Sequence, residues 1–464
     1  MISRRVLLAA PALLPAAASA QVAFPVLQDD TVAAGYRRDV LIRWGDRVTF
    51  DAPPFDPRTV DAEGASAQFG WDARIAGLVV PPAAADGVSR GVLAVAHPTV
   101  EAAMAFPGGV DRPQVAATMQ GATLLNVEVQ AGRWIVVDGG FQSRRLTAST
   151  LCRASGPNVD QAGSALQGVL GITGGCATPW GSLLLTEGDP APWLARLGIP
   201  GRAAGFGWLV ELDALDPQSI PVKHTALGRY GKADAAAALS RAGQAVVFVA
   251  ERGAGGYLFR FVSAAPPAGG GALEDGTLSV AQLQGGRITW AALPAGASAN
   301  AVEAARQAGG MAFDAPSGLA WDARNSRLLF CGGFGVLALS PDGGDPGAAG
   351  MSGNPLGPLQ MGTVQTISAD ARGRVLLGTD SGGPVGIYAQ TLWLMDGGSV
   401  TALYGAPRAA GIGGAAVSPD GRAIFTVARR PGAEPGASFD RPSTRWPQFE
   451  PGVPPRSALL SIAR

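Results

Sequence analysis

The sequence has very little lysine, histidine or cysteine. Its 464 residues include two lysines (Lys223 and Lys232), two histidines (His97 and His224) and three cysteines. Arginine therefore supplies nearly all of the positive charge, which we ascribe to a GC-rich genome rather than to function. With only two histidines, a histidine-based metal site or a histidine-dependent catalytic triad is poorly supported.

The cysteines, Cys152, Cys176 and Cys331, do not form a CxxC pair or any other zinc-binding spacing. They allow at most one disulfide and leave an odd thiol, and the sequence does not select the pair. A chain of this length does not need a disulfide for stability.

Charge and hydropathy exclude two classes of partner. Basic and acidic residues are equal in number, 36 of each. This balance argues against a nucleic-acid partner, which normally requires a basic face. After residue 20, no apolar run approaches the ~18 residues that span a bilayer, so we expect no membrane span. The 47% hydrophobic content indicates a folded globule with a large core.

The first 20 residues, Met1–Ala20, have the pattern of an export signal. A basic start and a short apolar stretch are followed by small residues before Gln21. Residues 3–8 (SRRVLL) resemble a twin-arginine motif, which directs the export of folded proteins, and an ordinary secretory signal is the alternative. We expect the mature chain to be periplasmic or secreted.

Short apolar runs between turn residues dominate the remaining sequence. Such runs of 4–8 residues indicate strands, and examples are residues 91–96, 245–250, 327–331, 374–378 and 422–427. Segments with helical periodicity are scarce, so the predicted fold class is all-β.

A weak repeat refines this prediction. A strand, an Asp-led turn and a second strand recur in residues 318–330, 367–379 and 416–427, with Asp322, Asp370 and Asp420 in the turns. A hairpin every ~40–50 residues is typical of propeller blades. Aspartate suits these turns because it hydrogen-bonds its own backbone, so we interpret the three residues as structural. The sequence predicts a single β-propeller of about six blades with loop insertions over residues 21–464, and we expect a monomer.

Several segments resemble the PhoX-type secreted alkaline phosphatases in order and spacing over essentially the whole mature chain. They are residues 35–46 (GYRRDVLIRWGD), 68–71 (QFGW), 174–181 (GGCATPWG), 207–213 (GWLVELD), 251–252 (ER) and 418–422 (SPDGR). The resemblance implies a β-propeller and phosphomonoesterase activity with a calcium and iron cluster in the central channel. In such a site, hard cations bind carboxylates and neutralise the phosphate.

The chain departs from the family's ligand pattern at several positions. Thr186 stands at the iron-binding cysteine, and Gly188 stands at a glutamate. Lys232, Ala410 and the pair at 429–430 (RR) replace further acidic or histidine residues. Because these changes remove a thiolate and several carboxylates, we expect no iron and no complete cluster, and we leave a calcium-only site open.

The remaining acids and two basic residues are the predicted site. Carboxylates suit Ca²⁺, and arginine suits bidentate contacts with phosphate. The predicted metal residues are Glu187, Asp189, Glu251, Asp314 and Asp380, and the predicted anion contacts are Arg252 and Lys232. The alternatives are structural: a polar strand end at Glu187, an ion pair between residues 251 and 252, a turn cap at 380 and a solvated lysine at 232.

Three functions remain open from the sequence. The first is a metal-dependent phosphomonoesterase with a reduced, calcium-only or lost metal site. The second is a non-catalytic propeller, a pseudo-phosphatase, that binds an anion or a protein. The third is a different propeller hydrolase, such as a calcium-dependent lactonase. For the first two, the expected small-molecule partner is phosphorylated or otherwise anionic.

Overall fold

The computed structural model describes residues 23–267, 271–357, 362–382 and 386–464. The predicted export signal, Met1–Ala20, lies outside these residues. Strands dominate the described chain and helices are short, so the fold is mostly β, as predicted. In this part of the chain, no helix is long and apolar enough to cross a membrane.

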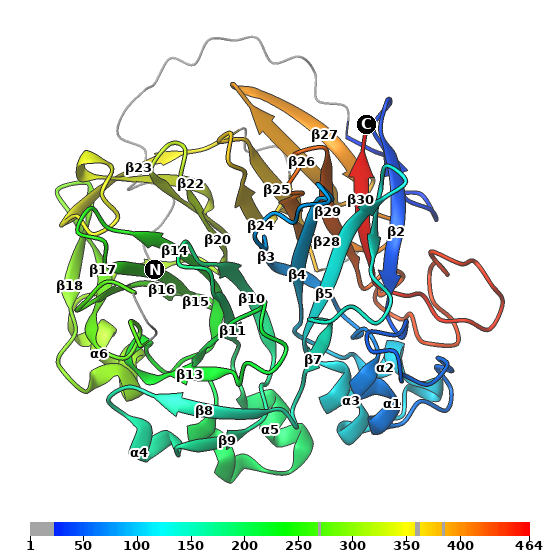
Figure 1. Cartoon of the computed structure of the whole chain (residues 1–464), viewed down its shortest axis with the longest axis horizontal. Helices are drawn as coiled ribbons and strands as arrows, with labels where there is room; N and C mark the ends of the chain where they lie inside the picture. The colour runs from blue at the N-terminus through cyan, green and yellow to red at the C-terminus, as the bar shows by residue number, and fades with distance from the viewer. Residues whose placement is uncertain (1–22, 268–270, 358–361, 383–385) are drawn as a thin grey trace.

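The innermost strands surround a central axis, and each contacts the next in a closed ring (Figure 1). They are β3 (Arg74–Val79), β10 (Ile172–Ala177), β14 (Lys232–Leu239), β20 (Pro316–Asp322), β24 (Val364–Ala369) and β28 (Gly411–Val417). Small residues allow this close approach. A Cβ on Gly77, for example, would lie 2.8 Å from the backbone nitrogen of Ala177. A cavity of about 640 Å³ remains between these strands.

Each inner strand pairs with the strand that follows it to form an antiparallel hairpin. The second strands are β4 (Arg90–His97), β11 (Leu183–Glu187), β15 (Ala245–Glu251), β21 (Arg327–Gly332), β25 (Val375–Thr379) and β29 (Ala423–Arg429). All six pairings shift register near the start of the inner strand. Such bulges re-aim side chains and are common beside functional sites.

Outer strands complete five hydrogen-bonded sheets. One sheet has ten strands because the outer strands of two successive meanders pair, with Ile288 opposite Met351. The outer strands are β5 (Gly121–Gln130), β6 (Arg133–Val136), β7 (Arg144–Leu146), β8 (Leu151–Ser155), β9 (Ala165–Gln167), β12 (Leu209–Leu212), β13 (Val222–His224), β16 (Gly256–Ser263), β17 (Gly276–Gln284), β18 (Arg287–Ala292), β19 (Ala312–Phe313), β22 (Gly335–Pro341), β23 (Gly350–Pro355), β26 (Thr391–Asp396) and β27 (Ser399–Gly405). The predicted number of blades stays a prediction.

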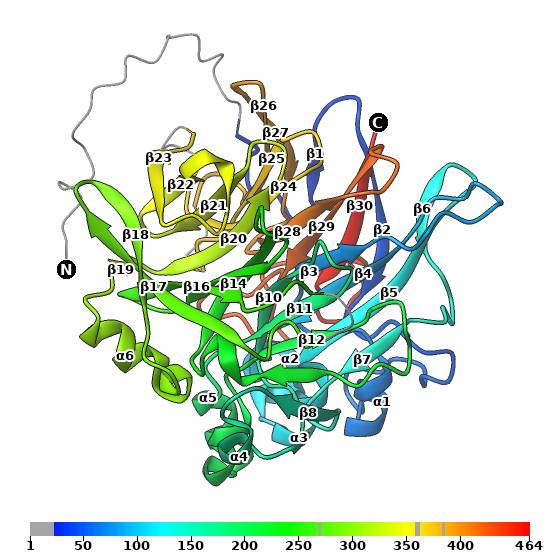
Figure 2. The ribbon, with the colours of Figure 1, turned by 60° about the vertical axis from the view of Figure 1, so that its left-hand side comes forward.

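Strands from the two ends of the chain close the ring. β2 (Arg37–Arg43) pairs with β30 (Ala458–Ala463), and β1 (Thr31–Val32) pairs with β27 (Figure 2). Before β30 the chain runs from residue 430 to 457 without a strand. The ends of the described chain are therefore tied into the fold by backbone hydrogen bonds.

Short helices gather mainly below the sheets in Figure 2, where α1 and α5 both contact α3. A buried hydrophobic cluster beside the helices includes Trp71, Phe106, Trp193 and Phe206. The helices are α1 (Ala62–Ala67), α2 (Ala102–Ala105), α3 (Pro113–Met119), α4 (Val159–Ala162), α5 (Ala191–Leu197) and α6 (Ala301–Gln307).

The repeated aspartates do have structural roles. One carboxylate oxygen of Asp322 accepts a hydrogen bond from the backbone of Asn325 at 3.1 Å, and Asp370 accepts two backbone hydrogen bonds at 2.9 Å. Asp420 binds the backbone nitrogen of Arg422 at 3.1 Å. Each therefore fixes the turn between an inner and a second strand. The three cysteines are free thiols.

Candidate functional site

Polar residues gather where the second strands end. His97, Glu187, Glu251 and Arg429 are the last residues of their strands, and Asp380 directly follows β25. The strands before them are buried, so each strand end carries a polar side chain out of an apolar layer. This pattern explains why strands far apart in the sequence supply one site.

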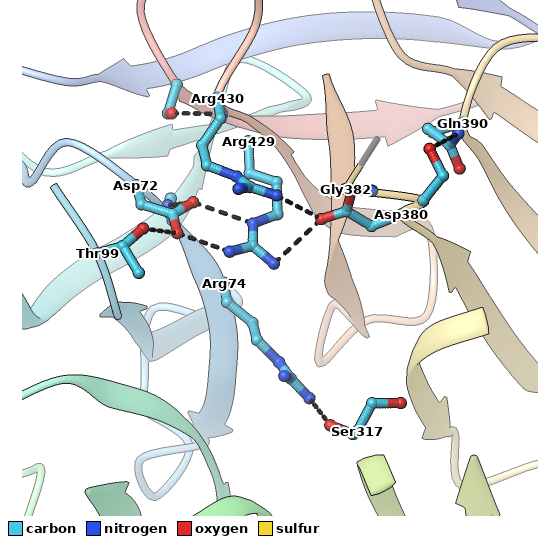
Figure 3. A network of polar contacts seen from close by, with 12 residues as sticks. Asp72, Arg74, Thr99, Ser317, Asp380, Gly382, Gln390, Arg429 and Arg430 are labelled. Carbon is cyan, nitrogen blue, oxygen red and sulfur yellow. Dashed lines mark hydrogen bonds and ion pairs between the residues drawn. The ribbon is translucent and has the colours of Figure 1, made fainter. Parts of the chain in front are cut away.

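Asp72 and Arg429 form the centre of an ionic network (Figure 3). The Arg429 guanidinium donates to both oxygens of the fully buried Asp72 carboxylate, at 3.0 and 2.6 Å. Arg429 and Arg430 also pair with the same oxygen of Asp380, at 3.2 and 3.0 Å. Arg430 reaches Glu101 at 3.1 Å. Two adjacent arginines thus form ion pairs with three carboxylates.

The ion pairs of the network set the ionisation state of Asp72. Burial would raise the pKa of Asp72, but the attraction of Arg429 and Arg430 and hydrogen bonds from Arg429 and Thr99 hold that pKa below its usual value. The same carboxylates raise the pKa of Arg429 against its burial. Both groups are therefore ionised at neutral pH.

A second buried ion pair lies at the start of β3. Arg74 donates to Asp234 and to the backbone carbonyl of Ser317, both at 2.8 Å. Arg74 and Asp234 line the 640 Å³ cavity between the inner strands. Asp234 also accepts from the backbone nitrogen of Gly175 at 3.0 Å and that of Leu319 at 3.2 Å, so it ties β10 and β20 to β14.

Glu187 pairs with a lysine of this chain. Its Oε1 lies 2.8 Å from Lys223 Nζ, and both side chains are fully buried. The carboxylate also accepts backbone hydrogen bonds from Leu170 and Trp208, each at 3.1 Å. These three contacts leave Glu187 with little capacity to bind a metal.

The Lys232 ammonium group is bound by backbone carbonyl groups. Its Nζ donates to the carbonyl oxygens of Gly207, Gly228 and Tyr230 at 2.6, 2.8 and 3.2 Å. An ammonium group has three hydrogens, so all of them are used. Burial lowers the pKa of Lys232 to about 7, against the attraction of Glu187 and Glu251.

The other predicted metal residues have separate local roles. Asp189 is exposed and accepts from the backbone of Ala191 at 2.9 Å, at the start of α5. Glu251 accepts from the backbone of Tyr257 at 3.1 Å, and burial raises the pKa of Glu251. Asp314 is exposed beside Gly333. Asp380 belongs to the arginine network.

Arg252 differs from its neighbours Arg74, Arg429 and Arg430, which are all held in ion pairs. It follows β15, is exposed, and makes no side-chain hydrogen bond or ion pair with the residues that the structure describes. Its pKa is lowered by partial burial and by the nearby charges of Arg429, Arg74 and Arg430. A guanidinium that faces other cations is a favourable contact for an added anion.

A cavity of about 310 Å³ adjoins the network. Its lining includes Asp380, Arg430 and Glu101, together with Tyr388 and Gln390. Of these five residues, the sequence predicts only Asp380 as part of the site. Asp72, Arg74 and the arginine pair at 429–430 are not predicted. For the arginine pair, the position at the end of an apolar strand is a signal that the sequence offers.

The implied calcium and iron cluster does not fit this arrangement. Thr186 stands at the cysteine position, fully buried and hydrogen-bonded to the Thr173 hydroxyl at 3.0 Å. Among the described residues, no three acids, histidines or cysteines gather closely enough to hold a metal ion. The carboxylates of Asp72, Glu187 and Asp380 are each paired with a basic side chain.

The closed ring of inner strands and the ionic cluster define a propeller-like β protein with a polar site in its channel. The sequence profile described as alkaline phosphatase PhoX matches residues 20–331. The chain belongs to the PhoX alkaline phosphatase family. No curated protein matches the sequence.

One solved structure shows the same fold. PhoX of Pseudomonas fluorescens, in complex with the transition-state analogue vanadate, is 22% identical with a TM-score of 0.85. The alignment covers 96% of this chain and 97% of that one. A gluconolactonase of Xanthomonas campestris is 10% identical with a TM-score of 0.38, covering 95% and 97%. A protein of unknown function from Dyadobacter fermentans is 12% identical with a TM-score of 0.44, covering 93% and 100%.

Proposed function

We propose that this chain is an exported, non-catalytic member of the PhoX family that binds a phosphorylated or similar anionic small molecule in its channel. The observation that carries the proposal is the contrast between Arg252 and its surroundings. The acids of the ionic network are paired with the chain's own arginines, while Arg252 has no such partner among the described residues.

The charge balance supports loss of the metal cluster. In a multinuclear site, carboxylates must be available to the cations. Here the carboxylates are not available. Asp72, Asp380 and Glu187 are paired with the basic side chains of Arg429, Arg430 and Lys223 in place of metal cations. A metal entering this site would have to displace buried ion pairs, and breaking such a pair costs roughly 3–5 kcal/mol.

The family supports the class of ligand. The related Pseudomonas protein binds vanadate, a mimic of a phosphoryl group in transfer. Arginine can hold such an anion by two parallel hydrogen bonds without a metal. The cavity beside Arg430 offers about 310 Å³ for the organic part of the ligand.

The proposal also includes the organisation inferred from the sequence. We take each antiparallel meander as one blade, which gives about six, and we propose a monomer exported through the signal at Met1–Ala20. A calcium-only site is the weaker alternative because the ion pairs of Glu187 and Asp380 compete with it.

Calorimetric titration of the mature protein with phosphate and with vanadate tests anion binding. Charge-assisted hydrogen bonds contribute about 1.5–3 kcal/mol. Arg252→Ala should therefore weaken binding by about 10- to 100-fold. Arg324→Ala is the matched control, because Arg324 is an exposed arginine that lines neither of the two cavities. It should bind like wild type.

Activity assays complete the test. With calcium and iron supplied, the wild-type protein should turn over neither an aryl phosphate nor a lactone. Metal-dependent hydrolysis of the aryl phosphate would show instead that the chain is an active phosphomonoesterase. Lactone hydrolysis would point to the other hydrolase. Equal anion binding by wild type and Arg252→Ala would remove Arg252 from the site.

A further inference from the structure

Both lysines of this chain are fully buried. All other basic residues apart from the two histidines are arginines. Lys223 and Lys232 reach the same loop, since their ammonium groups donate to the carbonyls of Gly205 at 2.9 Å and Gly207 at 2.6 Å. Both lysines of the chain therefore bind backbone carbonyls in the interior, and neither ammonium group is exposed on the surface.

The surroundings of Lys232 Nζ have the chemistry of a cation site. Its three hydrogen-bond acceptors are backbone carbonyls, from Gly207, Gly228 and Tyr230. The Tyr230 ring completes the enclosure, with its centroid 3.9 Å from Nζ. Carbonyl oxygens and aromatic faces are the groups that hold potassium and ammonium ions in proteins.

The backbone is shaped to aim these carbonyls. Gly207 and Gly228 have φ values of +82° and +89°, which favour glycine. A Cβ on Gly228 would lie 2.7 Å from the Tyr230 ring, so a side chain there would disturb the enclosure. The planar fork of arginine would not match three acceptors placed around one point, whereas an ammonium does.

Nearby charges favour a cation at this point. Glu187 and Glu251 both attract the Lys232 ammonium. Glu187 is already paired with Lys223. Glu251 has no ion-pair partner of its own among the described residues. Arg229 is the nearby cation that opposes the charge.

We propose that the carbonyls of Gly207, Gly228 and Tyr230 form a monovalent-cation site, which this chain fills with its own Lys232 ammonium. The side chain then acts as a tethered cation that joins the loop before β12 to the loop before β14. Removing the side chain leaves a carbonyl cage open to a free ion. The inference does not depend on anion binding at Arg252.

The test is the thermal stability of Lys232→Ala in chloride salts of equal ionic strength. Potassium and ammonium fit a carbonyl cage, and tetramethylammonium is too large for it. We expect either small ion to raise the midpoint of Lys232→Ala on the order of 1–3 °C over tetramethylammonium, increasing with concentration. Measurement at pH 6 keeps the wild-type lysine protonated.

Lys232→Met is the matched control because it fills the same space without a charge. It should be less stable than wild type and show no preference between the salts, and wild type should also show none. If Lys232→Ala does not fold in tetramethylammonium, recovery of folding in potassium or ammonium is the expected result. Equal behaviour of Lys232→Ala in all three salts, folded or unfolded, would overturn the proposal, as would the same ion preference in Lys232→Met.

Discussion

Arg429 and Asp72 lie 357 residues apart in the sequence, yet the guanidinium of one binds both carboxylate oxygens of the other. The pair joins the end of β29 to the start of β3, across the point where the ring of strands closes. Asp72 is fully buried, so the contact is part of the core as well as of the candidate site.

Loss of this partner should be costly. Arg429→Met leaves the Asp72 charge buried without its bidentate contact, and we expect a loss of about 3–5 kcal/mol in the free energy of unfolding. Urea denaturation measures it. Arg47→Ala removes an exposed pair with Asp138 and should cost less than about 1 kcal/mol. Similar losses in the two variants would contradict the assigned role.

Acid should weaken the same contact. The pKa of folded Asp72 lies below its usual value of 3.8, so the unfolded chain takes up the proton first as the pH falls. The contribution of Asp72 is therefore complete above about pH 3.8 and declines as the pH falls through the folded pKa. We expect the stability gap between wild type and Asp72→Asn to narrow from pH 6 to pH 3. A constant gap over that range would count against the shift.

The Glu187–Lys223 pair should behave as one unit. Glu187→Gln and Lys223→Met each leave one buried charge unpaired, and each should destabilise the fold by about 3–5 kcal/mol. The double variant should lose less than the sum of the two, with a coupling energy of about 0.5–3 kcal/mol in urea denaturation.

The exposed pair of Glu303 and Arg306 provides the matched cycle, because it joins the same charge types on a helix surface. Its coupling should stay below about 1 kcal/mol. Additive losses at Glu187 and Lys223 would show that the two side chains act independently.

Amine chemistry gives a fast check of lysine burial. Because Lys223 and Lys232 are fully buried, an amine-reactive ester should modify only the amino terminus of the native protein. In denaturant the same reagent should add to both lysines. Mass spectrometry counts the adducts, and rapid labelling of either lysine under native conditions would contradict the burial.

Local sequence patterns predicted the hairpins better than the site. Asp322, Asp370 and Asp420 organise their turns through neighbouring backbone groups, so a short window contains the whole signal. The mostly β fold follows from such windows repeated along the chain. The pairing of Asp72 with Arg429 depends on ring closure, which no local pattern encodes.

The direction of Lys232 shows a second limit. The register shift between Lys232 and Asp234 breaks the alternation of β14, so strand parity does not tell which way either side chain points. Asp234 meets Arg74, while Lys232 reaches loop carbonyls. Glu187 lies at a strand end, which was the structural alternative to its predicted metal role, and its partner, Lys223, lies 36 residues away on β13.

We propose that the chain's own basic side chains occupy the positions where the family is expected to hold metal ions. Elemental analysis of the folded, exported protein, produced with calcium and iron in excess and freed of loosely bound ions, tests it most directly. We expect far less than one equivalent of either metal, with Asp72→Asn and Glu187→Gln unchanged in metal content. Stoichiometric calcium or iron in the wild type that is lost in those variants would contradict it.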